Sequence, residues 1–192
     1  AAAAVICFEW LQRPENVLAG KIRWSDYRGR EHPTQIKIEH HKTGALVWHP
    51  LEELTEAGLV KFYEEAEEVL AQLPRRGIPV ILREVRAPKV RPDDQTYCKP
   101  YSFSGFEKIV QKMRKEIGLP STFTLDACRH GGMTELEEAE LTDGQGRALS
   151  AHSSKAYEGY AKRTHKRALA ATRKRHAYVL ADKGRTEFQN TA

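Results

Sequence analysis

One stretch of this chain alternates strictly between polar and apolar side chains, and it restricts the fold more than any other feature. Gln35-Ile36-Lys37-Ile38-Glu39 has the two-residue period of a strand with one buried face. An apolar segment follows at 45–48, and His40-His41-Lys42-Thr43-Gly44 between the two supplies the chemistry of a turn. We therefore predict one β-hairpin, with Lys42 at or beside its tip.

Most of the remaining chain has apolar residues at helical spacing, interrupted by proline and glycine. Helices are predicted over 5–18, where Pro14 starts a new helix or a kink, over 51–73, from Ser102 or Ser104 to about Gly118, from about Thr124 to Glu140, around Ala148 and Lys155, and over 165–180. Segment 79–100 holds four prolines and is predicted to be an extended connection. The expected fold class is mainly α with a small antiparallel β-sheet.

Size and composition indicate a globular protein with a buried core. The chain has 192 residues, of which 40% are hydrophobic and 30% charged. No apolar run approaches the ~18 residues of a membrane-spanning helix, and residues 1–7 lack the basic leader and cleavage region of a signal peptide. We expect a cytoplasmic protein. Cys7, Cys98 and Cys128 form no CxxC pair, which indicates buried thiols rather than a disulfide framework or zinc site.

Positive charge is concentrated near the C-terminus. Lys and Arg number 31 against 26 Asp and Glu, a formal net charge of +5. Segment 161–192 alone holds nine Lys or Arg, against the acidic residues Asp182 and Glu187. Such a segment is a candidate contact for a polyanion such as nucleic acid, and a solvated helix face explains the same composition equally well.

Five residues of types that serve in phosphoryl-transfer chemistry follow one another along the chain. Arg13 lies in Gln-Arg-Pro-Glu-Asn-Val-Leu, Lys42 in Lys-Thr-Gly, Arg129 in Cys-Arg-His and His152 in Ala-His-Ser-Ser, and Tyr160 comes last. Over about 11–162 the chain resembles the catalytic domain of the tyrosine recombinases, or phage-type integrases. The pattern of that family is Arg, a hairpin Lys, HxxR, His or Trp, and Tyr. The resemblance implies the DNA breaking-rejoining fold, and a site-specific recombinase that cleaves and rejoins DNA through a 3′-phosphotyrosyl intermediate at Tyr160.

The chemistry of the reaction explains why these residue types are needed together. In-line attack on a phosphodiester builds negative charge on the nonbridging oxygens, and Arg13 and Arg129 can clamp them with bidentate hydrogen bonds. His152 can add a third donor. A tyrosine hydroxyl has a pKa near ~10, so Tyr160 needs such positive surroundings to act as the nucleophile. Lys42 is the candidate general acid for the leaving 5′-oxygen. The reaction requires no metal or nucleotide cofactor.

The chain departs from the family pattern in three places: at Asp126, in the spacing of Tyr160, which follows His152 by eight positions where about nine are usual, and in two extra residues between Arg13 and Trp24. Asp126 stands where the HxxR pattern has a histidine or lysine, three residues before Arg129. Its carboxylate would orient Tyr160 or accept a proton, or it caps a helix, and the helix cap is the favoured interpretation. His130 is interpreted as structural or as a residue behind the catalytic ones. Tyr157 is the alternative nucleophile, but Tyr160 is favoured by its spacing from His152 and by the basic residues that follow it.

The resemblance also implies partners and domain limits. Residues 1–164 would form the catalytic domain, with its start truncated and the core-binding domain absent, and 165–192 a basic C-terminal helix or tail. Double-stranded DNA is the expected partner, contacted by Lys162 and Arg163 among others, with self-association as a tetramer and a bacterial or phage source near the nucleoid. Three alternatives are a catalytically inactive DNA-binding protein of the same fold, a basic helical interaction protein, and a type IB topoisomerase.

Overall fold

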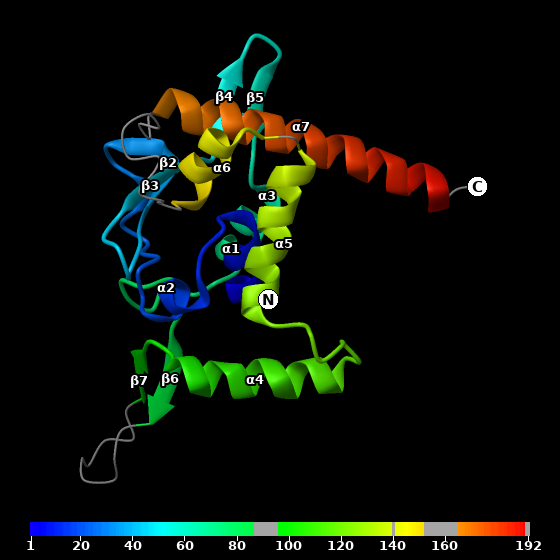
Figure 1. Cartoon of the computed structure of the whole chain (residues 1–192). Coiled ribbons are helices and arrows are strands. Elements are labelled where there is room, and N and C mark those ends of the chain that lie inside the picture. The colour runs from blue at the N-terminus through cyan, green and yellow to red at the C-terminus, as the bar shows by residue number, and fades with distance from the viewer. Residues whose placement is uncertain (87–95, 140, 152–164, 191–192) are drawn as a thin grey trace.

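The computed structural model describes residues 1–86, 96–139, 141–151 and 165–190, and Figure 1 shows how its elements are arranged. Its helices are α1 (Ala2–Glu9), α2 (Pro14–Leu18), α3 (Glu64–Ala71), α4 (Phe103–Glu116), α5 (Leu125–Glu138), α6 (Asp143–Ser150) and α7 (His165–Asn190). Its strands are β1 (Tyr27–Gly29), β2 (His32–Glu39), β3 (Leu46–Pro50), β4 (Glu52–Thr55), β5 (Gly58–Lys61), β6 (Arg83–Arg86) and β7 (Thr96–Lys99). The chain is mainly helical with small antiparallel sheets, as predicted.

The core is built around α1, which packs against α5 and α3 (Figure 1). Ile6, Cys7 and Trp10 are completely buried there. Gly132 allows the close approach of α5, because a Cβ at this position would lie 2.2 Å from the carbonyl oxygen of Phe8. This contact fixes the part of α5 that carries Arg129, one helical turn earlier.

The predicted hairpin is confirmed. Strands β2 and β3 pair antiparallel, with Ile38 opposite Val47 and Glu39 opposite Leu46. Ile36 and Ile38 are completely buried, so the alternating pattern indeed marks one core face and one outer face. The sheet is extended on its other side by β1, in the order β1-β2-β3.

The helix predicted over 51–73 is wrong for its first half. That half forms the hairpin of β4 and β5, and only α3 is helical. Leu54 and Leu59, which fitted the buried face of a helix, instead pair across the two strands and are 80% and 56% exposed. The turn between them places Gly58 at φ +119°, a conformation that glycine adopts without strain and that breaks a helix.

Of segment 79–100, predicted to be an extended connection, the structure describes residues 79–86 and 96–100. Residues 83–86 and 96–99 are extended and form a strand pair that the sequence did not reveal. Arg83 lies opposite Lys99 and Arg86 opposite Thr96 in the β6–β7 pair. Pro79 and Pro100 fall outside the paired residues, so neither removes a backbone donor from the ladder. Helix α4 follows with Ser102 at its N-cap, and it ends just before Gly118, whose φ is +73°.

The C-terminal helix is longer than predicted and packs on the body of the protein. Helix α7 contacts α6 and β3, and its later part extends away from the other helices (Figure 1). Arg175 anchors it, with 3% of its surface exposed. Its Nε donates to Glu135 Oε2 over 2.7 Å, and its Nη1 donates to the carbonyl oxygen of Glu9 over 2.5 Å. At least one basic residue of the C-terminal segment therefore serves internal packing.

The described cysteines are free thiols. The prediction of buried thiols holds for Cys7, and burial raises its pKa, whereas Cys98 and Cys128 are only half-buried. Within the described ranges, histidine, cysteine and carboxylate side chains form no group of three or more that could hold a metal ion. None of the helices described is both long enough and apolar enough to cross a membrane.

Candidate active site

A cleft of about 480 Å³ brings together three of the five predicted catalytic residues. Arg13 comes from the start of α2, Lys42 from the β2–β3 turn and Arg129 from α5. Ser150 and Ala151, at the end of α6, complete its wall. Positions far apart in the sequence therefore present three cationic side chains to one space.

Arg13 owes its place to the start of α2. It is the N-cap residue, with an extended backbone at φ −66° and ψ 140°, and Pro14 takes the first helical position. Proline is favoured there because its fixed φ suits the helix and its missing N–H would be unpaired in any case. Pro14, Val17 and Leu18 are buried, so this short helix is held by its apolar face and leaves the Arg13 side chain exposed.

Arg129 is the buried member of the set, with 5% of its surface exposed. Its Nη1 donates a hydrogen bond to the carbonyl oxygen of Leu11, two residues before Arg13. Leu11 adopts a left-handed conformation, φ +55°, at this point of the chain. One arginine is thus oriented by the backbone that leads directly to the other.

Burial lowers the pKa of Arg129, and the positive charge of Arg13 lowers it further. Arginine remains protonated in proteins, so these effects represent an unfavourable environment for a cation rather than a loss of charge. An anion in the cleft would relieve the repulsion between the two guanidinium groups. The described lining of the cleft carries three cationic side chains against one carboxylate, that of Glu15, so its electrostatics favour an anionic ligand such as a phosphodiester.

Lys42 lies in an exposed turn of defined geometry. The N–H of His40 donates to Ala45 O over 2.8 Å, and the N–H of Gly44 donates to His40 O over 2.8 Å. Gly44 has φ +64°, which closes the turn without strain. Lys42 occupies the outside of this turn, on the rim of the cleft and within the region that the sequence predicted.

Several of the remaining predicted site residues lie outside the residues that the structure describes. His152, Tyr160, Lys162 and Arg163, like the alternative nucleophile Tyr157, fall in residues 152–164, which the structure does not describe. Ala151 lines the cleft and ends α6 in a left-handed conformation, φ +57°. The segment that carries His152 therefore begins at the wall of the cleft.

Asp126 is not the helix cap that the sequence favoured. It lies within the first turn of α5, and the hydroxyl of Thr124 accepts the capping hydrogen bond from Ala127 N over 3.0 Å. A carboxylate in this first turn is favourable because it interacts with the positive end of the helix dipole. Asp126 is exposed, and its charge counteracts the lowering of the Arg129 pKa. His130 is exposed and does not line the cleft.

Two contributions to the cleft were not predicted from the sequence. The Leu11 carbonyl is a backbone group, so no residue type signals its contact with Arg129. Asn16 also lines the cleft and is 2% exposed, although it is polar. A polar residue on the apolar face of α2 is the signal that indicates a specific hydrogen-bonding role for it.

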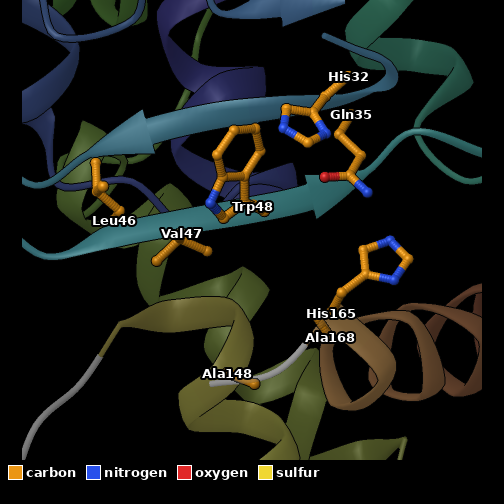
Figure 2. A pocket seen from close by; sticks show the side chains of 8 residues that line it. All are labelled: His32, Gln35, Leu46, Val47, Trp48, Ala148, His165 and Ala168. Atoms are coloured by element: carbon orange, nitrogen blue, oxygen red, sulfur yellow. The ribbon is translucent and has the colours of Figure 1, made fainter. Parts of the chain in front are cut away.

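A second pocket, of about 530 Å³, is lined by none of the predicted site residues that the structure describes. Figure 2 shows His32, Gln35 and Trp48 of the hairpin on one side and Ala148, His165 and Ala168 of α6 and α7 on the other. The rings of His32 and Trp48 meet edge to face, with centroids 4.5 Å apart. Among the described residues that line this pocket there is no arginine or lysine, whereas the described lining of the first cleft holds Arg13, Lys42 and Arg129. The first cleft is therefore the better candidate for an anionic ligand.

Comparison with known proteins identifies a similar solved structure. No protein-family model matches the chain, and neither does any curated protein. Among solved structures, the chain is similar to the integrase of the transposon Tn1549 in complex with circular intermediate DNA, with a TM-score of 0.47 and 16% identity. The match covers 88% of this chain and 55% of that one, so this chain spans little more than half of the solved protein. The residues of the cleft, and not this likeness, carry the functional inference.

Proposed function

We propose that this protein is a tyrosine-type site-specific DNA recombinase that cleaves and rejoins DNA strands through a 3′-phosphotyrosyl intermediate at Tyr160. One observation carries the proposal. Arg13, Lys42 and Arg129, the first three catalytic residues expected from the ordered motifs, line a single cleft, and the residue just before His152 lines it too. The motifs were selected from sequence order alone, so their meeting in space is an independent support.

The proposed reaction begins with attack of the Tyr160 oxygen on the scissile phosphorus. Arg13 and Arg129, with His152, would bind the nonbridging oxygens, whose negative charge increases as the pentacoordinate transition state forms. The bond to the 5′-oxygen breaks, and Lys42 donates a proton to that oxygen, releasing a 5′-hydroxyl. The 3′-phosphate is then joined to Tyr160, and the proton of its hydroxyl has gone to solvent or a nearby base.

Rejoining reverses these steps with a second DNA end. A 5′-hydroxyl attacks the phosphotyrosine, Lys42 takes up its proton, and Tyr160 leaves and is reprotonated. The number of phosphodiester bonds is conserved, so the cycle needs no external energy source. The proposed partners are double-stranded DNA, contacted also by Lys162 and Arg163, and further copies of the protein in a tetramer, and the proposed setting is a phage or another mobile element.

The test is capture of the covalent intermediate. The chain is incubated with labelled duplexes of randomised sequence that carry a nick, so that cleavage releases a short fragment and traps the protein on the DNA. Adducts are isolated on denaturing gels and their DNA is sequenced, which also identifies the cleaved site. We expect an adduct that Tyr160→Phe abolishes and Tyr157→Phe retains.

Other outcomes would change the proposal in defined ways. An adduct lost only in Tyr157→Phe would keep the reaction and move the nucleophile. Binding of duplex DNA without any adduct from the unaltered chain would refute catalysis and favour a DNA-binding protein of the same fold that does not cleave.

A further inference from the structure

A line of three hydrogen bonds connects α2 to the turn that carries Lys42. Gln12 Nε2 donates to the carbonyl oxygen of Trp10 over 2.6 Å, and Asn16 Nδ2 donates to Gln12 Oε1 over 3.0 Å. Asn16 Oδ1 then accepts from the backbone N–H of His41 over 2.5 Å. Gln12 and Asn16 are 0% and 2% exposed, so water does not compete for these bonds.

The direction of this hydrogen-bond line is fixed by its two ends. The Trp10 carbonyl can only accept and the His41 N–H can only donate. Each amide side chain must therefore point its NH₂ toward Trp10 and its oxygen toward His41, as observed. A carboxylate at either position has no donor and would leave two oxygens facing each other.

These hydrogen bonds connect the backbone segments that carry two proposed catalytic residues. Arg13 directly follows Gln12 and lies in the same turn as Asn16, while Lys42 directly follows His41. Lys21, which follows α2, and Glu39, the last residue of β2 before the turn, form a second link at 2.9 Å, but at partly exposed positions. The bond from His41 to Asn16 lies at the tip itself, where Lys42 is exposed.

We infer that Asn16 is a positioning residue, which places Lys42 for protonation of the leaving 5′-oxygen by holding the His41 backbone. This inference rests on the proposed function. It assigns Asn16 no contact with the reacting atoms, and it predicts a defect in one step only, the departure of the leaving group.

A substrate with a sulfur leaving group isolates that step. When sulfur replaces the bridging 5′-oxygen at the scissile phosphate, the product is a thiolate, whose conjugate acid has a pKa near ~8.5 and which leaves without a proton donor. The ratio of the cleavage rates of the two substrates measures protonation alone. A partly unfolded variant cleaves both substrates less, so loss of folded protein leaves this ratio unchanged.

The experiment uses the cleaved DNA sequence found above, in oxygen and sulfur forms. Asn16→Ala removes the acceptor of the His41 N–H and is expected to slow cleavage of the oxygen substrate about 100-fold, the order of effect of a misplaced catalytic group. The sulfur substrate is expected to react within about 3-fold of the unaltered chain, as it should in Lys42→Ala, where the proposed proton donor itself is absent. Arg13→Ala is expected to slow both substrates.

Asn16→Asp provides the matched comparison. It retains the acceptor for His41 but places a carboxylate oxygen against Gln12 Oε1, so it should lower the thermal midpoint of unfolding and leave the substrate ratio near that of the unaltered chain. Gln72→Glu, at an exposed position that ends α3, controls for the added negative charge.

The outcomes separate the two proposals. Equal loss on both substrates in Asn16→Ala, or no loss on either, would overturn the positioning role while the recombinase function stands. If the unaltered chain forms no adduct with either substrate, the proposed function falls and the positioning role falls with it.

Discussion

Acid should destabilise this protein through His49, a buried histidine on β3. Its side chain is completely buried, and neither ring nitrogen has a hydrogen-bond partner among the residues that the structure describes. Burial lowers its pKa from 6.5 to about 3, with a further contribution from the charge of His40. The folded protein therefore excludes a proton that the unfolded chain accepts.

The sign and size of the effect follow from this difference. Between pH 6.5 and about 3 the unfolded state binds more protons at His49, so the free energy of unfolding decreases as the pH falls. Each tenfold difference in proton affinity is worth about 1.4 kcal/mol. The full effect is on the order of 5 kcal/mol, a large share of the stability of an ordinary domain.

Urea unfolding at pH 8, 6.5, 5 and 4 measures the effect, with His49→Leu as the comparison. Leucine fills a similar volume and does not titrate, so the stability of the variant relative to the unaltered chain should increase by about 1.4 kcal/mol for each pH unit below 6. The carboxylates and His176 titrate in both proteins, so their contributions to the pH dependence cancel in the difference. A difference that stays constant from pH 8 to pH 4 would refute the assignment of acid sensitivity to His49.

Three further predictions concern packing and charge. Gly132→Ala should destabilise the protein by about 3 kcal/mol or more by overpacking, because its Cβ would lie 2.2 Å from the Phe8 carbonyl oxygen. Gly146→Ala, whose Cβ would have its nearest neighbour at 3.9 Å, should not destabilise it. Chemical denaturation distinguishes the two variants, and equal losses of stability would contradict the close approach of α5 to α1. Arg175→Met should cost about 3–5 kcal/mol by leaving the largely buried Glu135 without its partner, and the exposed pair of Arg76 and Glu84 should be worth less than about 1 kcal/mol in an Arg76→Met comparison. Arg13→Ala should lower DNA cleavage by about 10²- to 10³-fold in single-turnover assays, while the exposed Arg30→Ala, outside the cleft, should not change it.

The sequence predicted those elements that local patterns determine. Alternation at Ile36 and Ile38 identified the hairpin, and Pro14 identified the start of α2. The pattern failed over 51–61, where Leu59 stands three residues before Phe62 and seven before Ala66, the spacing of one helical face, while Leu54 and Leu59 pair across a tight turn. The hairpin is decided by Leu51 and Phe62, the buried residues that flank β4 and β5 at its open end, and the Phe62 N–H donates to Leu51 O there. Sequence periodicity does not predict such a contact.

The candidate site was predictable in its residue types but not in its supports. The order of Arg13, Lys42 and Arg129 indicated the chemistry, and the structure places all three at one cleft. Arg129 is held by the carbonyl oxygen of Leu11, and the residue before Lys42 is held through the backbone N–H of His41. Both are backbone groups, which no particular residue type signals. Such contacts depend on the path of the chain, 118 positions apart in the case of Arg129 and Leu11, and so require the fold.

Arg129 and Arg175, the two buried arginines among the described residues, lie in different electrostatic environments. Burial lowers the pKa of Arg175, but its neighbours Tyr63, Glu135 and Glu9 outweigh this effect and raise the pKa overall. Arg129 is equally enclosed, but burial and the neighbouring Arg13 lower its pKa. Placing a guanidinium next to another cation is unfavourable in the absence of a ligand, and folding tolerates such a cost where binding relieves it. Arg175 serves the docking of α7, whereas an anion bound beside Arg129 would raise its lowered pKa, as its proposed role in binding a phosphodiester requires.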